Sequence, residues 1–212
     1  SSRLRSKATA LIEGKTVIAH LIERMKRVRN ASKIVLCTST HPDDQVLLEI
    51  AKKEGITGFA GSELDVMKRF IDAAQQNGFE HIVRTTGDNP LTDPKTIDDM
   101  IETHLKEGYD FTKSEFLPIG ANAEVIALSA LQKAYQMAED TSLTEYMTTY
   151  LKRPDVFKVH VFENHDPFLA DRLSIRLTVD YEEDLTVMNE IYGRLYRSNP
   201  AFTIQDVLKV LD

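Results

Sequence analysis

The chain has 212 residues, of which 42% are hydrophobic and 28% charged, and its formal net charge is −7 at pH 7. This length suits one globular domain that buries its own core. The negative balance argues against broad binding to nucleic acid or to an anionic membrane, because both need a basic surface. A single cysteine, Cys37, excludes an internal disulfide and fits a reducing cytoplasm. No apolar run approaches membrane-spanning length.

Strand and helix patterns alternate through the first half of the chain. Short links between such elements predict a parallel sheet covered by helices on both faces. In chain order we expect a helix at 15–28, a strand at 33–39, a helix at 42–55, a strand at 56–61, a helix at 63–78, a strand at 81–88 and a helix at 94–108.

The second half has a different order of elements. Two consecutive helices followed by two strands predict an antiparallel excursion at one sheet edge, where a homodimer contact is common. No linker or repeat interrupts the chain, so we expect one domain over residues 1–212. The expected elements are strands at 109–114 and 123–128, helices at 129–140 and 142–153, strands at 156–163 and 173–180, and helices at 182–197 and 203–211.

Two aspartates come directly after expected strands. Asp88 follows "HIVRTTG" and Asp180 follows "LSIRLTV". Ligands of open α/β sheets bind at the carboxyl ends of the strands, and carboxylates there suit Mg²⁺ that carries nucleotide phosphates. Either residue alone is more typical of a helix N-cap or a turn, so both interpretations stay open.

The N-terminus carries the cations Arg3, Arg5 and Lys7 just ahead of the first helix. Such a segment suits a grip on a triphosphate, because arginine offers phosphate a planar fork and lysine a point charge. A phosphate-binding loop normally follows a strand, and the sequence shows none before Ser1. We therefore expect either a strand ahead of Ser1 or a solvated tail.

Six segments in order match the patterns of a known family: "SSRLRSK", "FAGSELDVMKRF", "IVRTTGDNPLTDP", "PIGANAEVIALSAL", "TEYMTTYLKRP" and "IRLTVDYEEDL". On these segments the sequence resembles the spore coat polysaccharide biosynthesis protein F group of cytidylyltransferases, relatives of the acylneuraminate and 3-deoxy-manno-octulosonate cytidylyltransferases. The resemblance spans nearly the whole chain. It implies a nucleotide-diphospho-sugar transferase fold of the α/β class, a Rossmann-like three-layer sandwich with a mostly parallel central sheet.

The resemblance also implies a function, the transfer of CMP from CTP to a sugar or sugar acid with release of pyrophosphate. Mg²⁺ is the implied cofactor. The single cysteine and the expected excursion at the sheet edge favour a cytoplasmic homodimer. The strand that the family places before "SSRLRSK" would lie ahead of Ser1, at the centre of the sheet.

Residue by residue, the resemblance assigns the site. The expected catalytic residues are Arg3 and Lys7 on the triphosphate, with Asp88 and Asp180 as Mg²⁺ ligands. Asn122 and Glu124 would face the acceptor sugar. The nucleotide pocket would be completed by Thr38, Ser39, Gly61, Ser62, Asp65, Arg84 and Gly87.

Departures from the family patterns fall near the two ends of the substrate site. Arg5-Ser6 stands where the family has Pro-Gly, Asn122 replaces an aspartate, and Leu143, Thr144 and Glu145 replace a "REH" segment. These changes leave two alternatives open. One is a nucleotide-sugar binding domain without catalysis. The other is a glycosyltransferase of the same fold, although "TGDNP" supplies only one acid of the D-x-D motif typical of that class.

Overall fold

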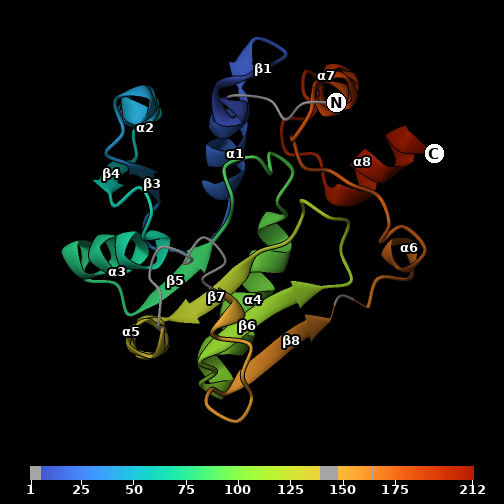
Figure 1. Ribbon diagram of the computed structural model, residues 1–212. Coiled ribbons are helices and arrows are strands. Elements are labelled where there is room, and N and C mark those ends of the chain that lie inside the picture. Colours follow the sequence, from blue (N-terminus) through green and yellow to red (C-terminus); the bar gives the residue numbers. More distant parts are fainter. Residues whose placement is uncertain (1–5, 139–147, 164) are drawn as a thin grey trace.

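A computed structural model describes residues 6–138, 148–163 and 165–212 of the chain (Figure 1). The helices are α1 (Val17–Met25), α2 (Gln45–Lys53), α3 (Val66–Asn77), α4 (Pro94–Glu107), α5 (Leu128–Met137), α6 (Pro167–Ala170), α7 (Glu182–Leu195) and α8 (Ile204–Leu211). The strands are β1 (Leu11–Ile12), β2 (Lys15–Thr16), β3 (Val35–Ser39), β4 (Thr57–Gly61), β5 (His81–Arg84), β6 (Phe111–Glu115), β7 (Glu124–Ala127) and β8 (Val159–Glu163). Short 3₁₀ turns cover Lys7–Thr9 and Pro42–Asp44.

The strands confirm the α/β class and its mixed sheet. β3 and β4 pair in parallel, from Val35 opposite Thr57 to Ser39 opposite Gly61. The other large sheet has the order β5-β7-β6-β8, in which β7 is antiparallel to both of its neighbours and β6 is parallel to β8. The antiparallel strand therefore lies inside the sheet, not at the edge where the sequence analysis placed the excursion.

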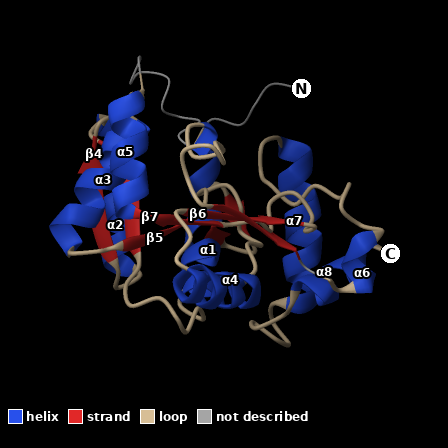
Figure 2. Ribbon diagram, turned by 90° about the horizontal axis from the view of Figure 1, so that it is seen from below, coloured by secondary structure: helices blue, strands red, loops and turns tan. Residues whose placement is uncertain are grey.

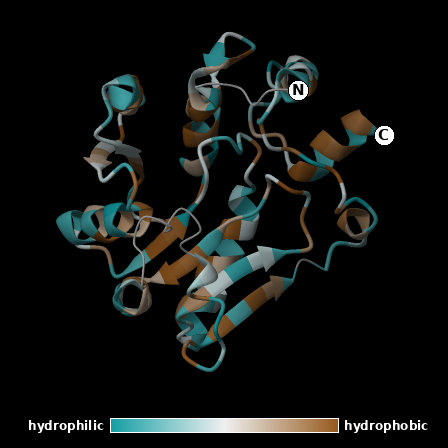
Figure 3. Ribbon diagram, viewed as in Figure 1, coloured by the Kyte–Doolittle hydropathy of each residue, from teal (hydrophilic) through white to brown (hydrophobic). Residues whose placement is uncertain are grey.

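Helices cover both faces of this sheet, and β7 shows how the two faces are separated. Successive side chains of a strand point to opposite faces. Val125 packs in a cluster with Ile97 and Met100 of α4, whereas its neighbour Ile126 packs in a cluster with Met67 of α3. Figure 2 shows the strands lying between α4 and the pair α3 and α5. β5 and β7 are coloured largely as hydrophobic in Figure 3, as expected for strands covered on both faces.

β3 and β5 belong to separate sheets in the described part of the chain, and a cavity of about 360 Å³ lies between them. Its walls include Val35 and Cys37 of β3 and Ile82 of β5. Phe70 of α3 borders it from one face and Ile101 of α4 from the other, so the cavity passes through the sheet layer. The strand expected ahead of the first residue would fit this gap, and it stays a prediction.

The first expected helix begins two residues later than the sequence pattern indicated. A hairpin of β1 and β2 precedes it, and its turn places Glu13 and Gly14 at φ values of 48° and 78°. Thr16 is the N-cap of α1, because its side chain accepts a hydrogen bond from the backbone of Ala19. The β-branched and polar residues at 15 and 16 therefore form a short strand and a cap.

The expected strand at 173–180 is wrong. In this segment only Arg176 forms a bridge, opposite Ile119. The first two residues of the segment are in a turn, and its later hydrogen bonds go to two different loops, since Leu177 N donates to Ile119 O and Val179 N donates to Asp88 O at 2.9 Å. The first half of the expected helix at 142–153 lies outside the described residues. Its second half, 148–153, is not an α-helix but a short 3₁₀ turn followed by a loop.

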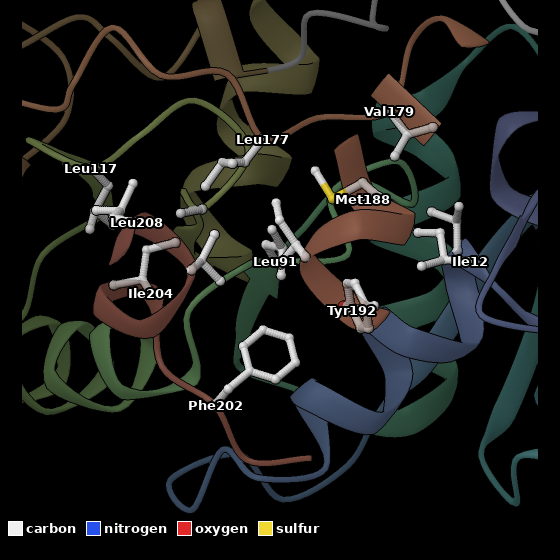
Figure 4. Packing of buried hydrophobic residues seen from close by; sticks show 14 of the residues in the cluster. Ile12, Leu91, Leu117, Leu177, Val179, Met188, Tyr192, Phe202, Ile204 and Leu208 are labelled. Carbon is white, nitrogen blue, oxygen red and sulfur yellow. The ribbon is translucent and has the colours of Figure 1, made fainter. Parts of the chain in front are cut away.

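A hydrophobic cluster supports the ends of these segments. Leu91, Leu177 and Val179 are fully buried in it together with Met188 of α7 (Figure 4). Burial of side chains of this size stabilises the fold by roughly 1.5–3 kcal/mol each. The cluster thus fixes the chain immediately beside both Asp88 and Asp180. None of the described helices combines the length and apolar character needed to cross a bilayer.

Candidate active site

Three of the expected catalytic residues meet in space. Nζ of Lys7, at the start of a 3₁₀ turn, lies 3.3 Å from Oδ2 of Asp88 and also donates a hydrogen bond to Oδ1 of Asp180. These carboxylates lie 81 and 173 positions along the chain from Lys7. The three side chains are between 19% and 28% exposed, so the group opens to solvent without being freely hydrated.

The charges of this group stabilise each other. The hydrogen bond from Lys7 lowers the pKa of Asp180, and the nearby charge of Arg176 adds to that effect. Partial burial alone would lower the pKa of Lys7, but the hydrogen bond to Asp180 and the charge of Asp88 outweigh it and raise this pKa. Both groups are therefore ionised at neutral pH.

Neither aspartate is a helix N-cap. The cap of α4 is Asp93, whose carboxylate accepts from Thr96, and the cap of α7 is Tyr181. Asp88 does lie in a turn, but its carboxylate accepts from Lys7. The N-cap interpretation of these two residues is therefore wrong. Their carboxylates instead share one cation, the ammonium of Lys7.

Arg176 is a member of the group that the sequence analysis did not single out. Its Nη1 donates to Oδ2 of Asp180 at 2.7 Å, and its Nη2 contacts both carboxylate oxygens of Asp184, at 2.5 and 2.7 Å. Asp184 in turn accepts from the backbone of Asp180 and Tyr181, at 2.7 and 2.8 Å. An i, i+4 spacing brings side chains together on a helix, and this segment was expected to be a strand, so no sequence signal indicated the pairing.

A second group lines a polar cavity of about 290 Å³ beside the first. Arg84 and Glu124 form an ion pair of 2.7 Å across β5 and β7, and Asn122 accepts from Ser114 at 3.5 Å. Asn89, the neighbour of Asp88, also lines this cavity. The lining includes two further cations that the sequence analysis did not assign, Lys113 and Lys152.

The remaining expected nucleotide residues lie at the carboxyl ends of β3 and β4. Thr38 and Ser39 are buried, and Ser39 faces Gly61 across the strand pair. Ser39 donates to Asp44 at 2.5 Å. Arg69 of α3 packs on Gly61, and its buried Nε has no hydrogen-bond partner among the residues that the structure describes. This free donor is a further candidate that the sequence analysis missed.

Ser62 and Asp65 follow β4 and have structural contacts. Ser62 accepts from the backbone of Asp65, and Asp65 is the N-cap of α3, where it accepts from Lys68 at 2.9 Å and from the hydroxyl of Tyr135 at 2.8 Å. These bonds fix the start of α3. If Asp65 also binds the nucleotide, as expected, it must do so while it keeps these hydrogen bonds.

Gly87 lies between the two halves of the expected site. It borders a smaller cavity of about 160 Å³ together with Cys37 of β3 and Ala8 of the N-terminal turn. A side chain at Gly87 would lie 3.4 Å from Ile18, so the position is already closely packed. Arg3 and residues 143–145 lie outside the described residues.

The donor set at Asp88 and Asp180 fits Mg²⁺. Lys7 already provides a positive charge between the two carboxylates, which shows that a cation is favoured at this point. Across residues 6–138, 148–163 and 165–212, no set of three or more His, Cys, Asp or Glu side chains could hold a metal ion. Mg²⁺ is commonly held by one or two carboxylates with water and substrate phosphates as the other ligands.

The α/β layers are those of nucleotidyltransferase-like folds. A solved cytidylyltransferase from Leptospira borgpetersenii superposes with a TM-score of 0.90 and 28% identity, covering 100% of this chain and 89% of that one. Residues 1–203 match the family described as cytidylyltransferase. The chain belongs to this family, as the sequence resemblance implied.

Two relatives connect the chain to particular branches of the family. It is 29% identical to the spore coat polysaccharide biosynthesis protein SpsF of Bacillus subtilis over 200 residues, covering 92% of this chain and 82% of that protein. It is 33% identical to a 3-deoxy-manno-octulosonate cytidylyltransferase of Chlorobaculum tepidum over 111 residues, covering 51% of this chain and 43% of that enzyme.

Proposed function

We propose that this protein transfers CMP from CTP to a sugar acid, with release of pyrophosphate, for the assembly of a surface polysaccharide or glycan. The observation that carries the proposal is the convergence of Lys7, Asp88 and Asp180 from three distant parts of the chain. Family membership supports the nucleotide. The names of the Bacillus and Chlorobaculum relatives support the acceptor class and the pathway type.

In this proposal Asp88 and Asp180 hold Mg²⁺, which when bound neutralises triphosphate charge. Lys7, with Arg3 from outside the described residues, offsets the negative charge that develops on the departing pyrophosphate. The acceptor hydroxyl loses its proton to solvent, and its oxygen forms a bond to the α-phosphorus. The bond between the α-phosphorus and the oxygen that bridges it to the β-phosphate breaks, and that oxygen leaves with pyrophosphate. Positioning and charge neutralisation supply the catalysis.

The residues expected at the site divide between the two substrates. Thr38, Ser39, Gly61 and Ser62 are assigned to the nucleotide, and the cavity around Asn122 and Glu124 to the acceptor. The acceptor cavity is lined by three cations, Arg84, Lys113 and Lys152, and by two carboxylates, those of Glu115 and Glu124. One positive charge therefore remains in excess, which supports an acceptor that carries a carboxylate.

The test measures pyrophosphate release with CTP, ATP, GTP and UTP in Mg²⁺, using 3-deoxy-manno-octulosonate, N-acetylneuraminate and mannose as acceptors. We expect release from CTP with an acidic sugar only. CTP binding without release for any acceptor would instead identify a binding domain. Release of a nucleoside diphosphate from a finished nucleotide sugar would identify a glycosyltransferase.

The proposal includes a cytoplasmic homodimer, as the single cysteine and the expected excursion at the sheet edge favoured. Light scattering after size exclusion is expected to give about twice the chain mass of 24.0 kDa. A single peak at the chain mass, unchanged with concentration, would contradict the homodimer.

A further inference from the structure

The two carboxylate oxygens of Asp180 are held by different cations. Oδ1 accepts from Lys7, whose Nζ also lies 3.3 Å from Asp88. Oδ2 accepts from Arg176 at 2.7 Å. Asp180 therefore has one side that faces Asp88 across an ammonium and another side that faces away from it.

The two cations are held to different degrees. Arg176 makes a forked contact with both carboxylate oxygens of Asp184. Asp184 also accepts from the backbone of Asp180 and Tyr181, so several hydrogen bonds hold Arg176 in place. Lys7 reaches the carboxylates through one ammonium on a flexible four-carbon stem. The contact of Lys7 is the one that can be exchanged without breaking the rest.

We propose that Lys7 is an internal cation that occupies the position between Asp88 and Asp180 until a triphosphate draws it away, whereas Arg176 and Asp184 keep Asp180 oriented throughout. This inference rests on the proposed function, because it places the metal at the same two carboxylates. Lys7 and Arg176 act here as positioning residues with opposite effects on the metal.

The physical basis is charge. Two carboxylates that share one site repel each other unless a cation lies between them, and an ammonium and a metal ion cannot both take that place. A bound triphosphate offers Lys7 another anionic partner. Metal and triphosphate therefore favour each other's binding, and the coupling is reciprocal.

The test uses Mn²⁺ as the probe, in the absence of nucleotide, with free Mn²⁺ measured by electron paramagnetic resonance. We expect Lys7→Met to bind Mn²⁺ about tenfold more tightly than the unmodified protein, a typical coupling. Lys7→Arg, which keeps a cation, is expected to bind no more tightly than the unmodified protein. Lys209→Met serves as a control, since Lys209 is exposed on α8 and forms an ion pair with Asp206.

The second half of the proposal is tested with Arg176→Met. We expect this variant to bind Mn²⁺ several-fold more weakly, because Asp180 loses the contact that orients it. Arg172→Met is the matched control, because Arg172 pairs with Asp212 at 2.7 Å outside the site. Thermal melting of each variant verifies that it is folded.

Three results would overturn the proposal. Equal or weaker Mn²⁺ binding by Lys7→Met, or no Mn²⁺ binding by any variant, would contradict the role of Lys7. Unchanged Mn²⁺ binding by Arg176→Met would contradict the role of Arg176 in orienting Asp180. These readings involve no CTP, so failure of the proposed transfer reaction would appear separately, in the pyrophosphate assay.

Discussion

Nη1 of Arg84 donates a hydrogen bond to Oε2 of Glu124 at 2.7 Å, across the β5–β7 pair, and both side chains are at most 20% exposed. The family resemblance assigned Arg84 to the nucleotide and Glu124 to the acceptor sugar. The structure joins them, so each residue neutralises the other in the wall of the acceptor cavity.

This pairing predicts strong coupling between the two positions. Glu124→Leu or Arg84→Leu alone leaves a partly buried charge without its partner and is expected to lower the free energy of unfolding by about 1–3 kcal/mol. The double variant should lose at least about 1 kcal/mol less than the sum of the single losses. Chemical denaturation measures all four proteins.

The exposed pair Lys95 and Asp99 provides the control cycle, with an expected coupling of about 0.3–0.5 kcal/mol. A coupling between Arg84 and Glu124 no larger than this would show that their contact does not contribute to the fold. The KM for the acceptor is expected to rise in all three variants, and the KM for CTP less.

Gly120→Ala is expected to destabilise the protein strongly. Gly120 has a φ of +97°, and a Cβ there would lie 2.6 Å from the backbone carbon of Leu177. Gly14 also has a positive φ, +78°, but a Cβ there would meet nothing within 4 Å. We expect a loss of about 1–2 kcal/mol for Gly14→Ala and at least about 3 kcal/mol for Gly120→Ala.

Denaturant titration distinguishes the two glycine variants, and pyrophosphate release gives a second readout. The segment that contains Leu177 leads directly to Asp180, so activity should fall with Gly120→Ala and persist with Gly14→Ala. Equal stability losses for the two variants would contradict the close approach at Gly120.

Stability should decrease below pH 6.5 because of His104. This side chain is fully buried, 2.9 Å from the hydroxyl of Thr112, and burial lowers its pKa from 6.5 to about 4. The unfolded chain binds a proton near pH 6.5 that the folded chain does not bind until about pH 4. The contribution is therefore complete above pH 6.5 and is lost as the pH falls toward 4, by up to ~3 kcal/mol.

Unfolding free energies from pH 7.5 to 4.5 measure this effect. His104→Leu is expected to have a shallower decrease with falling pH. Some decrease will remain, because burial lowers the pKa of His20 as well. His165→Leu, at an exposed position, should keep the full slope. Identical slopes for the His104 variant and the unmodified protein would show that His104 does not contribute.

The gap between β3 and β5 should accept an apolar strand. Val35 of β3 and Ile82 of β5 line its sides, and Phe70 and Ile101 border it from the two faces. Cys37, the single cysteine, lines both cavities and reports on the gap. Joining five valine and isoleucine residues ahead of Ser1 should slow alkylation of Cys37.

A glycine-serine extension of equal length is the control for this experiment and should leave the alkylation rate unchanged. Equal rates for the two extended chains would show that the gap does not take up a strand.

Much of the local structure could be predicted from the sequence, because its signals are local. Asp93, Pro94 and Gly108 mark the two ends of α4 in the sequence and in the structure. The antiparallel placement of β7 between β5 and β6 could not be predicted in this way, since pairing partners distant in sequence leave no local pattern. Residues 173–180 were misassigned because an extended backbone with β-branched residues resembles a strand even where no strand pairs with it.

The candidate site, too, could be predicted only in part. Family patterns indicated Lys7, Asp88 and Asp180, and the two aspartates also follow expected strands. Arg176 was quoted within one of those patterns but given no role, because its contacts depend on how residues 175–184 turn into α7. The contact of Arg84 with Glu124 depends on strand register, which the sequence alone did not provide.

We propose that the carboxylates of Asp88 and Asp180 and the side-chain ammonium of Lys7 form a single site for a metal-bound triphosphate. Isothermal titration with CTP in Mg²⁺ tests this claim most directly, on the unmodified protein, Asp88→Asn, Asp180→Asn and the exposed control Asp155→Asn. We predict Mg²⁺-dependent CTP binding that each site variant weakens by more than about tenfold, or 1.4 kcal/mol, and that the control leaves unchanged. Binding of equal strength in all four proteins would contradict the account.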